Sequence, residues 1–359
     1  MLHVNMIELE NKWKKWNIPI DRKEYIHYLS FFLITSLILF FLGIFLNETN
    51  LDEILYASNP FVFWFVRIIA EFGSIAGILI AFCGIRLYVK PRIGRSALFA
   101  YGIAWIVTTF LKIIVRDLRP SQNIYQGRPL GLGWGFPSSI SAGLVCFWGF
   151  VLFHAIKYPN LKVRKILNWM GWIFTILIPF SHIIIGMSDL EDIFGGYLIG
   201  FPILGFFLLF DAKLSKIYIQ GLKIIIIGFI LSVFYVGLGY ITFSLIFPEY
   251  SQEIFESLTI SSGIILGLTS IYAITINQKW SKFENFPIKR RNLIFFIQIL
   301  LILVISIGFE LLFPNIVMYG IIQGLIIVIL SIISILPAIV LNFLERKGIS
   351  TTSTELSSN

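Results

Sequence analysis

Residues 112–140 gather the side chains and backbone groups that commonly bind phosphate. Lys112 and Arg119 are seven residues apart, close to two helical turns, so a continuing helix would place both cations on one face. Later in the same stretch, a glycine-rich loop leads into Ser138 and Ser139, residues that favour the start of a helix. Cations opposite an open helix N-terminus form an anion site, and phosphate is its usual ligand. The stretch therefore predicts a phosphate-binding site.

A second polar stretch, residues 181–192, adds groups that could act as a nucleophile, a base or an orienting acid. Ser188 precedes Asp192 by four residues and follows His182 by six. A serine needs a neighbouring base to become a nucleophile, but six residues of helix separate two side chains by about 9 Å. A direct Ser188–His182 hydrogen bond therefore requires the helix to break near Gly186. Plainer alternatives also stay open, with His182 as a buried, hydrogen-bonded residue and the carboxylates as part of a solvated acidic loop.

The composition identifies an integral membrane protein. The 359 residues are 57% hydrophobic and 13% charged, a balance far more apolar than that of soluble domains. A net charge of +8 would favour nucleic acid in a soluble protein, but these cations fall in alternate loops between apolar runs, so nucleic acid is excluded as a partner. Cys83 and Cys146 lie inside apolar runs, which argues against a disulfide framework.

Ten apolar runs approach the roughly 20 residues that an α-helix needs to cross a bilayer. They are predicted at about Leu29–Leu46, Ile68–Val89, Ser96–Val115, Ser138–Ile156, Ile166–Met187, Ile193–Phe210, Leu222–Phe247, Leu258–Ile276, Leu293–Phe313 and Ile316–Leu341. We therefore predict an all-α integral membrane protein with about ten transmembrane helices. The predicted organisation is a cytoplasmic or interfacial segment at residues 1–28, a six-span core at 29–211, a four-span C-terminal module at 212–345 and a disordered cytoplasmic tail at 346–359.

The distribution of Lys and Arg predicts the orientation of the spans. With both termini in the cytoplasm, alternate loops fall on the cytoplasmic side and hold nearly all the cations, as the positive-inside rule requires. The exceptions are Arg67, Lys112, Arg116, Arg119 and Arg128. Four of these five lie in residues 112–140, and a cluster that violates the rule indicates a functional site. We expect that site on the extracytoplasmic face of a plasma (inner) membrane.

The second predicted span carries a further polar feature. Gly73 and Gly77 form a pair of small residues four apart, a pattern that favours close helix packing. Beside them, Glu71 is a carboxylate within an apolar run, and Arg67 lies one helical turn earlier. The two side chains are therefore expected to pair with each other.

Three short motifs in the chain resemble those of the type 2 phosphatidic acid phosphatase, or lipid phosphate phosphatase, superfamily. The first motif is Lys, six residues and Arg-Pro, and the chain matches it in full from Lys112 to Arg119-Pro120. The second is Pro-Ser-Gly-His, which stands here as Pro137-Ser138-Ser139-Ile140. The third is Ser-Arg, five residues, His, three residues and Asp, which stands here as Ser181-His182, Ser188 and Asp192. The spacing is kept, whereas the second and third motifs are degenerate.

The resemblance implies a six-helix core over residues 29–211 and a site that needs neither metal nor cofactor. In the superfamily, the third-motif histidine is the nucleophile, the following Asp orients it, and the second-motif histidine protonates the leaving group. The phosphate ligands that the resemblance implies here are Lys112, Arg119, Ser138, the Ser139 amide, and His182 when it is protonated. The positions of nucleophile, orienting acid and proton donor are held by Ser188, Asp192 and Ile140.

The leading hypothesis is a membrane protein that binds a lipid phosphate or diphosphate at its outer face but has lost the family's catalysis. Ile140 cannot donate a proton, and Ser188 replaces the nucleophilic histidine. Membrane lipids are then its partners. One alternative is a divergent phosphatase or phosphotransferase that acts on phosphatidate or a polyprenyl (di)phosphate through Ser188, Asp192 and His182. Another alternative is a lipid transport-related protein that uses the last four spans.

Overall fold

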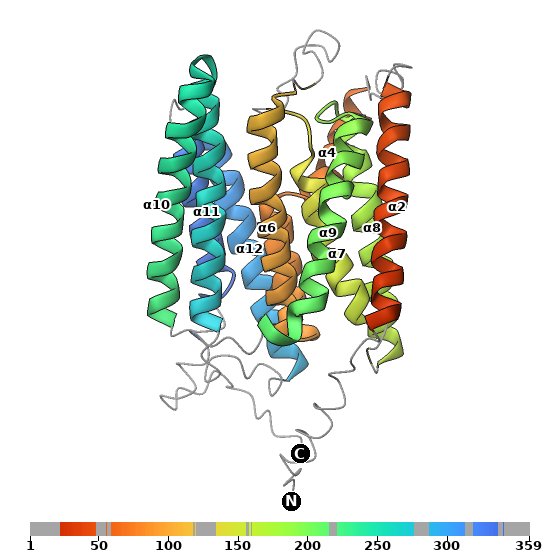
Figure 1. Cartoon of the computed structure of the whole chain (residues 1–359). Coiled ribbons are helices and arrows are strands. Elements are labelled where there is room, and N and C mark those ends of the chain that lie inside the picture. The colour runs from red at the N-terminus through yellow and green to blue at the C-terminus, as the bar shows by residue number, and fades with distance from the viewer. Residues whose placement is uncertain are drawn as a thin grey trace, which may run out of the picture.

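The computed structural model of the chain is a bundle of α-helices (Figure 1). It describes residues 22–47, 55, 59–117, 119, 134–155, 158, 160–214, 221–275, 287–312, 319–336 and 340. The helices of the first half are α2 (Arg22–Asn47), α4 (Pro60–Glu71), α5 (Ile75–Tyr88), α6 (Pro91–Val115), α7 (Ser139–Ala155), α8 (Leu161–Ile184) and α9 (Leu190–Leu214). Those of the second half are α10 (Gly221–Ile246), the 3₁₀ helix η1 (Pro248–Tyr250), α11 (Ser251–Thr275), α12 (Ile288–Leu312) and α13 (Tyr319–Ile333). The all-α prediction is confirmed for these residues.

The lengths and compositions of the described helices are those of an integral membrane protein. Six helices are long and apolar enough to cross a membrane, and the bent pair α4–α5 would make a seventh span. Three shorter apolar helices accompany them in the described part of the chain, at Leu33–Leu46, Ser139–Ala155 and Gly324–Ile333. The count of ten spans, the sides of the termini and the division into a core and a module stay predictions. Most of the predicted N-terminal segment and the whole predicted tail lie outside the described residues.

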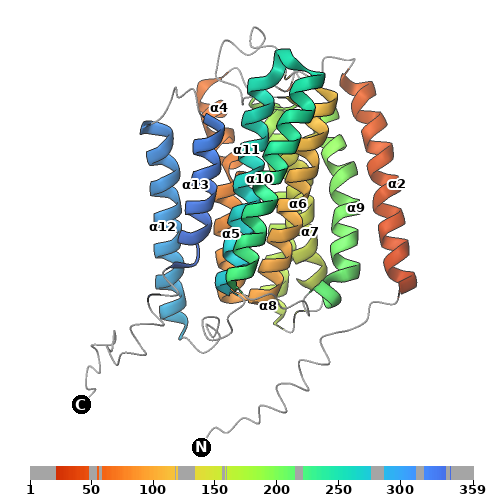
Figure 2. The ribbon, with the colours of Figure 1, turned by 60° about the vertical axis from the view of Figure 1, so that its left-hand side comes forward.

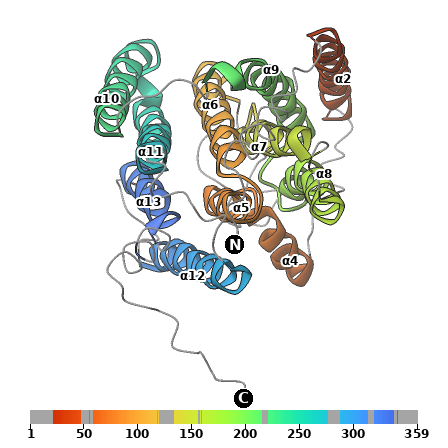
Figure 3. The same ribbon diagram turned by 90° about the horizontal axis from the view of Figure 1, so that it is seen from below.

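Helix α7 lies at the centre of the first group of helices. It packs against α6, α8 and α9, while α2 lies against α9 (Figure 3). The large side chain of Trp148 on α7 is almost completely buried. Two glycines of α9 allow it to approach α7 closely: a Cβ on Gly196 would lie 2.5 Å from the Ser138 carbonyl oxygen, and one on Gly200 would lie 2.8 Å from that of Ala142. The start of α9 is thereby held against the start of α7.

The second predicted span is bent rather than straight. Its two parts, α4 and α5, are inclined by 51°, and α4 begins at Pro60, earlier than predicted. The hydroxyl of Ser74 starts α5 by accepting the N–H of Gly77 (3.3 Å), as helix-capping serines do. Gly73 lies in the turn, where a Cβ would come within 2.9 Å of the Ile140 side chain on α7. The bend therefore forms where the second span meets the start of α7.

Helices α10, α11, α12 and α13 form a row beside the first group (Figures 2 and 3). Within the row, α11 packs against α10 and α13. The backbones of α11 and α13 touch at Gly263 and Gly324, where a Cβ on either glycine would overlap the backbone of the other helix. The row contacts the first group through α11 against α6 and through α12 and α13 against α5.

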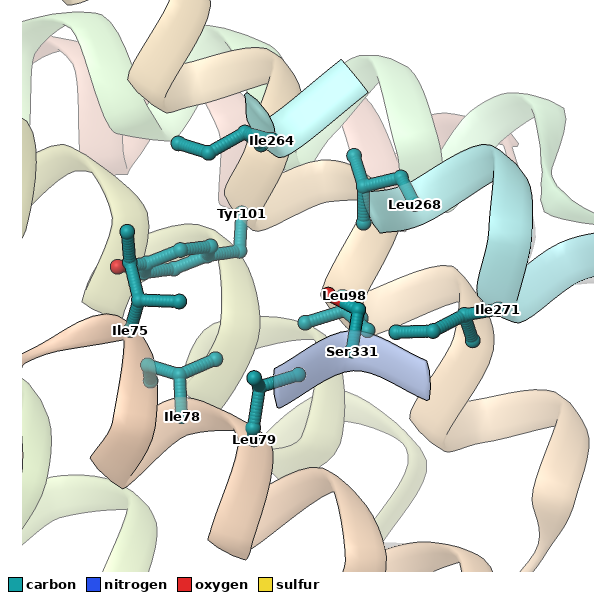
Figure 4. A pocket seen from close by; sticks show the side chains of 9 residues that line it. All are labelled: Ile75, Ile78, Leu79, Leu98, Tyr101, Ile264, Leu268, Ile271 and Ser331. Atoms are coloured by element: carbon teal, nitrogen blue, oxygen red, sulfur yellow. The ribbon is translucent and has the colours of Figure 1, made fainter. Parts of the chain in front are cut away.

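A small apolar cavity lies between the two groups (Figure 4). It is lined by Ile75, Ile78, Leu79, Leu98, Tyr101, Ile264, Leu268, Ile271 and Ser331. The hydroxyl of Tyr101 is buried without a hydrogen-bond partner among the described atoms. Because none of these residues is a cation, the cavity lacks the groups that bind phosphate.

Candidate functional site

Helix α6 ends before the second cation of the first motif. Its last residue is Val115, and Arg116 takes a left-handed conformation with φ 56° while its N–H donates to the Lys112 carbonyl (2.8 Å). The prediction that one helix face carries both Lys112 and Arg119 is therefore wrong, because the helix stops between them. Arg119 reaches the site from the segment that follows the helix.

The Lys112 ammonium lies against the segment that leads into α7. Its Nζ donates to the carbonyl oxygens of Trp134 (2.6 Å) and Gly135 (2.5 Å). An ammonium has three donors, so one N–H remains for an anion. Asp192 lies within electrostatic range of Lys112, and Gly135 is so close to Asp192 that a Cβ there would lie 2.9 Å from Oδ2. Lys112 thus joins the end of α6 to the starts of α7 and α9.

The start of α7 is hydrogen-bonded to the start of α9. Ser138 donates its N–H to the Asp192 carbonyl (2.9 Å), and its Oγ accepts the N–H of Ser141 (3.3 Å). The hydroxyls of Ser139 and Thr108 share a hydrogen bond of 2.8 Å, so the Ser139 side chain faces α6. Its N–H belongs to the first turn of α7, where backbone donors have no partner within the helix and can bind an anion.

The helical conformation is interrupted at Gly186, the position at which a Ser188–His182 hydrogen bond would require the helix to break. Helix α8 ends at Ile184, and Gly186 has φ 74°, a conformation that glycine adopts without strain. The N–H of Met187 then returns to the His182 carbonyl (2.8 Å). Ser188 follows as a buried residue just before α9.

Arg119 connects this break with the other residues that are predicted to bind phosphate. Its Nη1 donates to the Met187 carbonyl (2.6 Å), and the Asp192 carboxylate lies within electrostatic range. Burial lowers the pKa of Arg119 while Asp192 raises it, and a guanidinium stays protonated at physiological pH. Asp192 is 1% exposed, with Oδ2 accepting the N–H of Asp189 (3.1 Å) and Oδ1 without a partner among the described atoms. The residues brought together at this end of the bundle are Lys112, Arg119, Ser138, Ser139 and Asp192.

His182 does not pair with Ser188 in this structure. Its ring is 5% exposed and is hydrogen-bonded to the Ala70 carbonyl of α4. The Nε2 atom is buried without a partner among the described atoms. The charges that act on the ring belong to Arg119 and Arg67. The base and nucleophile of the phosphatase alternative are therefore not hydrogen-bonded, although the break at Gly186 permits it.

The position of the family's proton donor is apolar in this chain. Ile140 lies in the first turn of α7 and faces the bend of the second span, close to Gly73. It packs against the large apolar cluster that includes Ile178 of α8. An aliphatic side chain in apolar surroundings offers no proton to a leaving group.

Sequence reasoning missed one cation at this end of the bundle. Arg67 pairs with Glu71 (Nε to Oε1, 2.9 Å), as expected, but its Nη1 also reaches the sulfur of Met187 (3.1 Å). Its violation of the positive-inside rule was the signal that could have assigned it to the site. Arg116, in contrast, turns away, and its Cζ lies 3.4 Å from the centroid of the Phe247 ring.

Comparisons with known proteins agree with the resemblance that the three motifs indicate. The family model described as the PAP2 superfamily matches residues 94–216. Lipid phosphate phosphatase delta of Arabidopsis thaliana is 25% identical over 156 residues, which are 42% of this chain and 35% of that protein. Phosphatidylglycerophosphatase B of Bacillus subtilis (strain 168) is 25% identical over 145 residues, which are 39% of this chain and 68% of that protein.

These matches cover only part of the compared proteins. This chain spans about a third of the length of the plant relative, and no solved structure matches it significantly. The matched segment nevertheless contains all three motifs and the helices α6 to α9 that carry them. Residues 94–216 of the chain are therefore similar to the PAP2 superfamily.

Proposed function

We propose that this chain binds the phosphate or diphosphate group of a membrane lipid and has lost the family's hydrolysis. The observation that carries the proposal is the meeting of Lys112, Arg119 and the start of α7 around Asp192. In the same site, Ser188 and Ile140 stand where the family has its two histidines. The ligands are kept and the reacting groups are replaced.

Binding would use charge-assisted hydrogen bonds and the α7 N-terminus. Lys112 has a third N–H in addition to those bound to the carbonyls at 134 and 135, and a guanidinium such as Arg119 binds phosphate through two parallel donors. The N–H of Ser139 adds a backbone donor at the positive end of a helix. Asp192 balances part of this charge when the site is empty of anion.

Loss of turnover follows from the two replaced side chains. Phosphoryl transfer to the protein needs an activated nucleophile, and Ser188 has no hydrogen bond to the buried His182. Departure of the lipid alcohol needs a proton, which Ile140 cannot supply. A bound phosphate would therefore be held rather than transferred.

The distribution of cations supports an orientation for the site. With both termini in the cytoplasm, the cations of residues 112–140 fall on the extracytoplasmic face of a plasma (inner) membrane. A lipid of the outer leaflet could then place its phosphate at the site while its chains stay in the bilayer. Membrane lipids are the partners that this arrangement favours.

The test is lipid binding by the purified full-length chain in phosphatidylcholine nanodiscs, with phosphatidate as the added ligand. We expect Lys112→Ala combined with Arg119→Ala to weaken phosphatidate binding by at least roughly 100-fold, because each charge-assisted bond contributes about 1.5–3 kcal/mol. Lys165→Ala is the matched control, since this exposed lysine lies near the start of α8, at the opposite end of the bundle. Wild-type affinity in the double variant would refute the proposal. Phosphate release that disappears in Ser188→Ala and His182→Ala would support the divergent phosphatase instead.

A further inference from the structure

Helix α4 carries an arginine among exposed apolar side chains. Its most exposed apolar side chains are Phe61, Trp64, Phe65 and Ile68. A cation on such a helix is costly in a membrane and usually serves a function. The ion pair between Arg67 and Glu71 has side chains 29% and 49% exposed, and pairs of this kind contribute little to stability. The ion pair alone therefore does not account for Arg67.

The guanidinium groups of Arg67 and Arg119 meet on a single residue. Arg67 donates from Nη1 to the sulfur of Met187 (3.1 Å), and Arg119 donates from Nη1 to the carbonyl of the same residue (2.6 Å). A thioether is a weak acceptor, so an anion can displace it from Arg67 at little cost. Arg67 also lies outside the segment 94–216 that matches the family, so the three motifs do not include it.

A buried nitrogen without a partner lies in the field of the same two cations. His182 is 5% exposed, its ring bonds to the Ala70 carbonyl, and its Nε2 has no partner among the described atoms. Buried polar atoms normally have a hydrogen-bond partner. A phosphate oxygen would supply one here, because His182 can take a proton and donate from Nε2 when an anion offsets the charges of Arg67 and Arg119.

We propose that Arg67, His182 and Arg119 form a second anion subsite that binds the second phosphate of a lipid diphosphate. This inference rests on the proposed function and deepens it, since the first phosphate occupies the site of Lys112 and the α7 N-terminus. Arg119 belongs to both subsites, as its fork of five N–H donors allows. Two phosphates that share one guanidinium must be adjacent, as they are in a diphosphate. With a monophosphate bound, Arg67 would keep its hydrogen bond to the sulfur of Met187.

The test compares farnesyl phosphate with farnesyl diphosphate, two probes that have the same chain and differ by one phosphate. Binding is measured on the full-length protein in phosphatidylcholine nanodiscs. We expect the wild type to prefer the diphosphate. Arg67→Ala should weaken diphosphate binding by about 10- to 100-fold, the effect of losing one charge-assisted contact, and should weaken monophosphate binding far less. Glu71→Gln should strengthen diphosphate binding, because it removes the carboxylate that competes for Arg67.

The outcomes separate this inference from the proposed function. An equal change for both probes in Arg67→Ala, or no change for either, overturns the second subsite, while monophosphate binding that still requires Lys112 keeps the proposed function. If the wild type binds neither probe, the second subsite is overturned, while phosphatidate binding still decides the proposed function. Arg67→Gln keeps much of the side-chain volume and the polarity without the charge, so it should reproduce the loss of diphosphate binding even if Arg67→Ala is poorly folded. Thermal unfolding of each variant establishes which preparations are folded.

Discussion

The replacement of Ser188 and Ile140 by histidine should turn the binding site into a phosphatase. The proposed phosphate ligands Lys112 and Arg119 are already in place, and Asp192, at the position that orients the nucleophile in the family, lies buried beside them. The double variant Ser188→His with Ile140→His therefore restores the two groups that the mechanism lacks. The expected product is inorganic phosphate, released from phosphatidate through a phosphohistidine at position 188.

The size of the effect depends on which histidine is restored. A general acid contributes roughly 10²- to 10⁴-fold to rate, so Ser188→His alone should be slower than the double variant by that factor. Ile140→His alone should release no phosphate, because the nucleophile is still missing. Position 188 is only 7% exposed, and a larger side chain there should lower stability by about 1–3 kcal/mol. Position 140 exchanges apolar contacts for a polar ring, at a cost of similar size.

The assay measures phosphate release from phosphatidate in nanodiscs, together with a phosphohistidine trapped at alkaline pH. The matched control is the double variant Ser188→Gln with Ile140→Gln, which introduces polar side chains that cannot act as nucleophile or acid. A histidine double variant that folds and binds phosphatidate like the wild type, yet releases no more phosphate than the glutamine control, would refute the reasoning. The obstacle to turnover would then lie in the geometry of the site and not in the two replaced side chains.

Two further predictions concern the packing that supports the site. Gly196→Ala should lower the free energy of unfolding by about 1–3 kcal/mol, because its Cβ would lie 2.5 Å from a carbonyl oxygen at the start of α7. Thermal unfolding measures this loss. Gly237→Ala is the control, because a Cβ there meets nothing within 4 Å. Tyr250 packs edge-to-face on Trp134, whose carbonyl oxygen accepts a hydrogen bond from Lys112. An aromatic pair contributes about 0.5–1.5 kcal/mol, so Tyr250→Ala should weaken phosphatidate binding by up to about tenfold. Tyr240→Ala, which removes an aromatic contact within the C-terminal helices, should leave binding unchanged, and an equal loss in both tyrosine variants would contradict the link to Lys112.

Motif spacing predicted which residues meet because it places them relative to helix ends. Lys112 lies in the last turn of α6, Ser138 directly precedes α7, and Asp192 lies in the first turn of α9. Consecutive helices from α6 to α9 run in opposite directions, so these three ends lie on the same side of the bundle. Equally local reasoning located the helix break that a Ser188–His182 hydrogen bond would require near Gly186, since glycine readily adopts positive φ.

Tertiary contacts account for what the sequence could not predict. The spacing of Lys112 and Arg119 fits a helix, but Arg116 ends α6 in a left-handed conformation because it contacts the C-terminal helices. The apolar run of the second span contains no residue that forbids a straight helix, and its bend at Gly73 forms where α7 and α8 pack against it. The same bend sets the direction of α4, so the proximity of Arg67 to Met187 could not be read from their positions in the chain.

The C-terminal helices support the proposed phosphate ligands through their contacts with Arg116. Three cations within residues 112–119 repel one another, and the left-handed turn at Arg116 sends one of them away from the site. That turn costs about 1–2 kcal/mol for a residue with a Cβ. The contact of its Cζ with the Phe247 ring, 3.4 Å from the centroid, supplies a cation–π interaction of about 0.5–2 kcal/mol. An oxygen of Glu249 lies 4.0 Å from Nη1 and adds a weak ionic contact. The turn is thus held by Phe247, which joins α10 to η1, and by Glu249 of η1, and it leaves Lys112 to bind the carbonyls at 134 and 135.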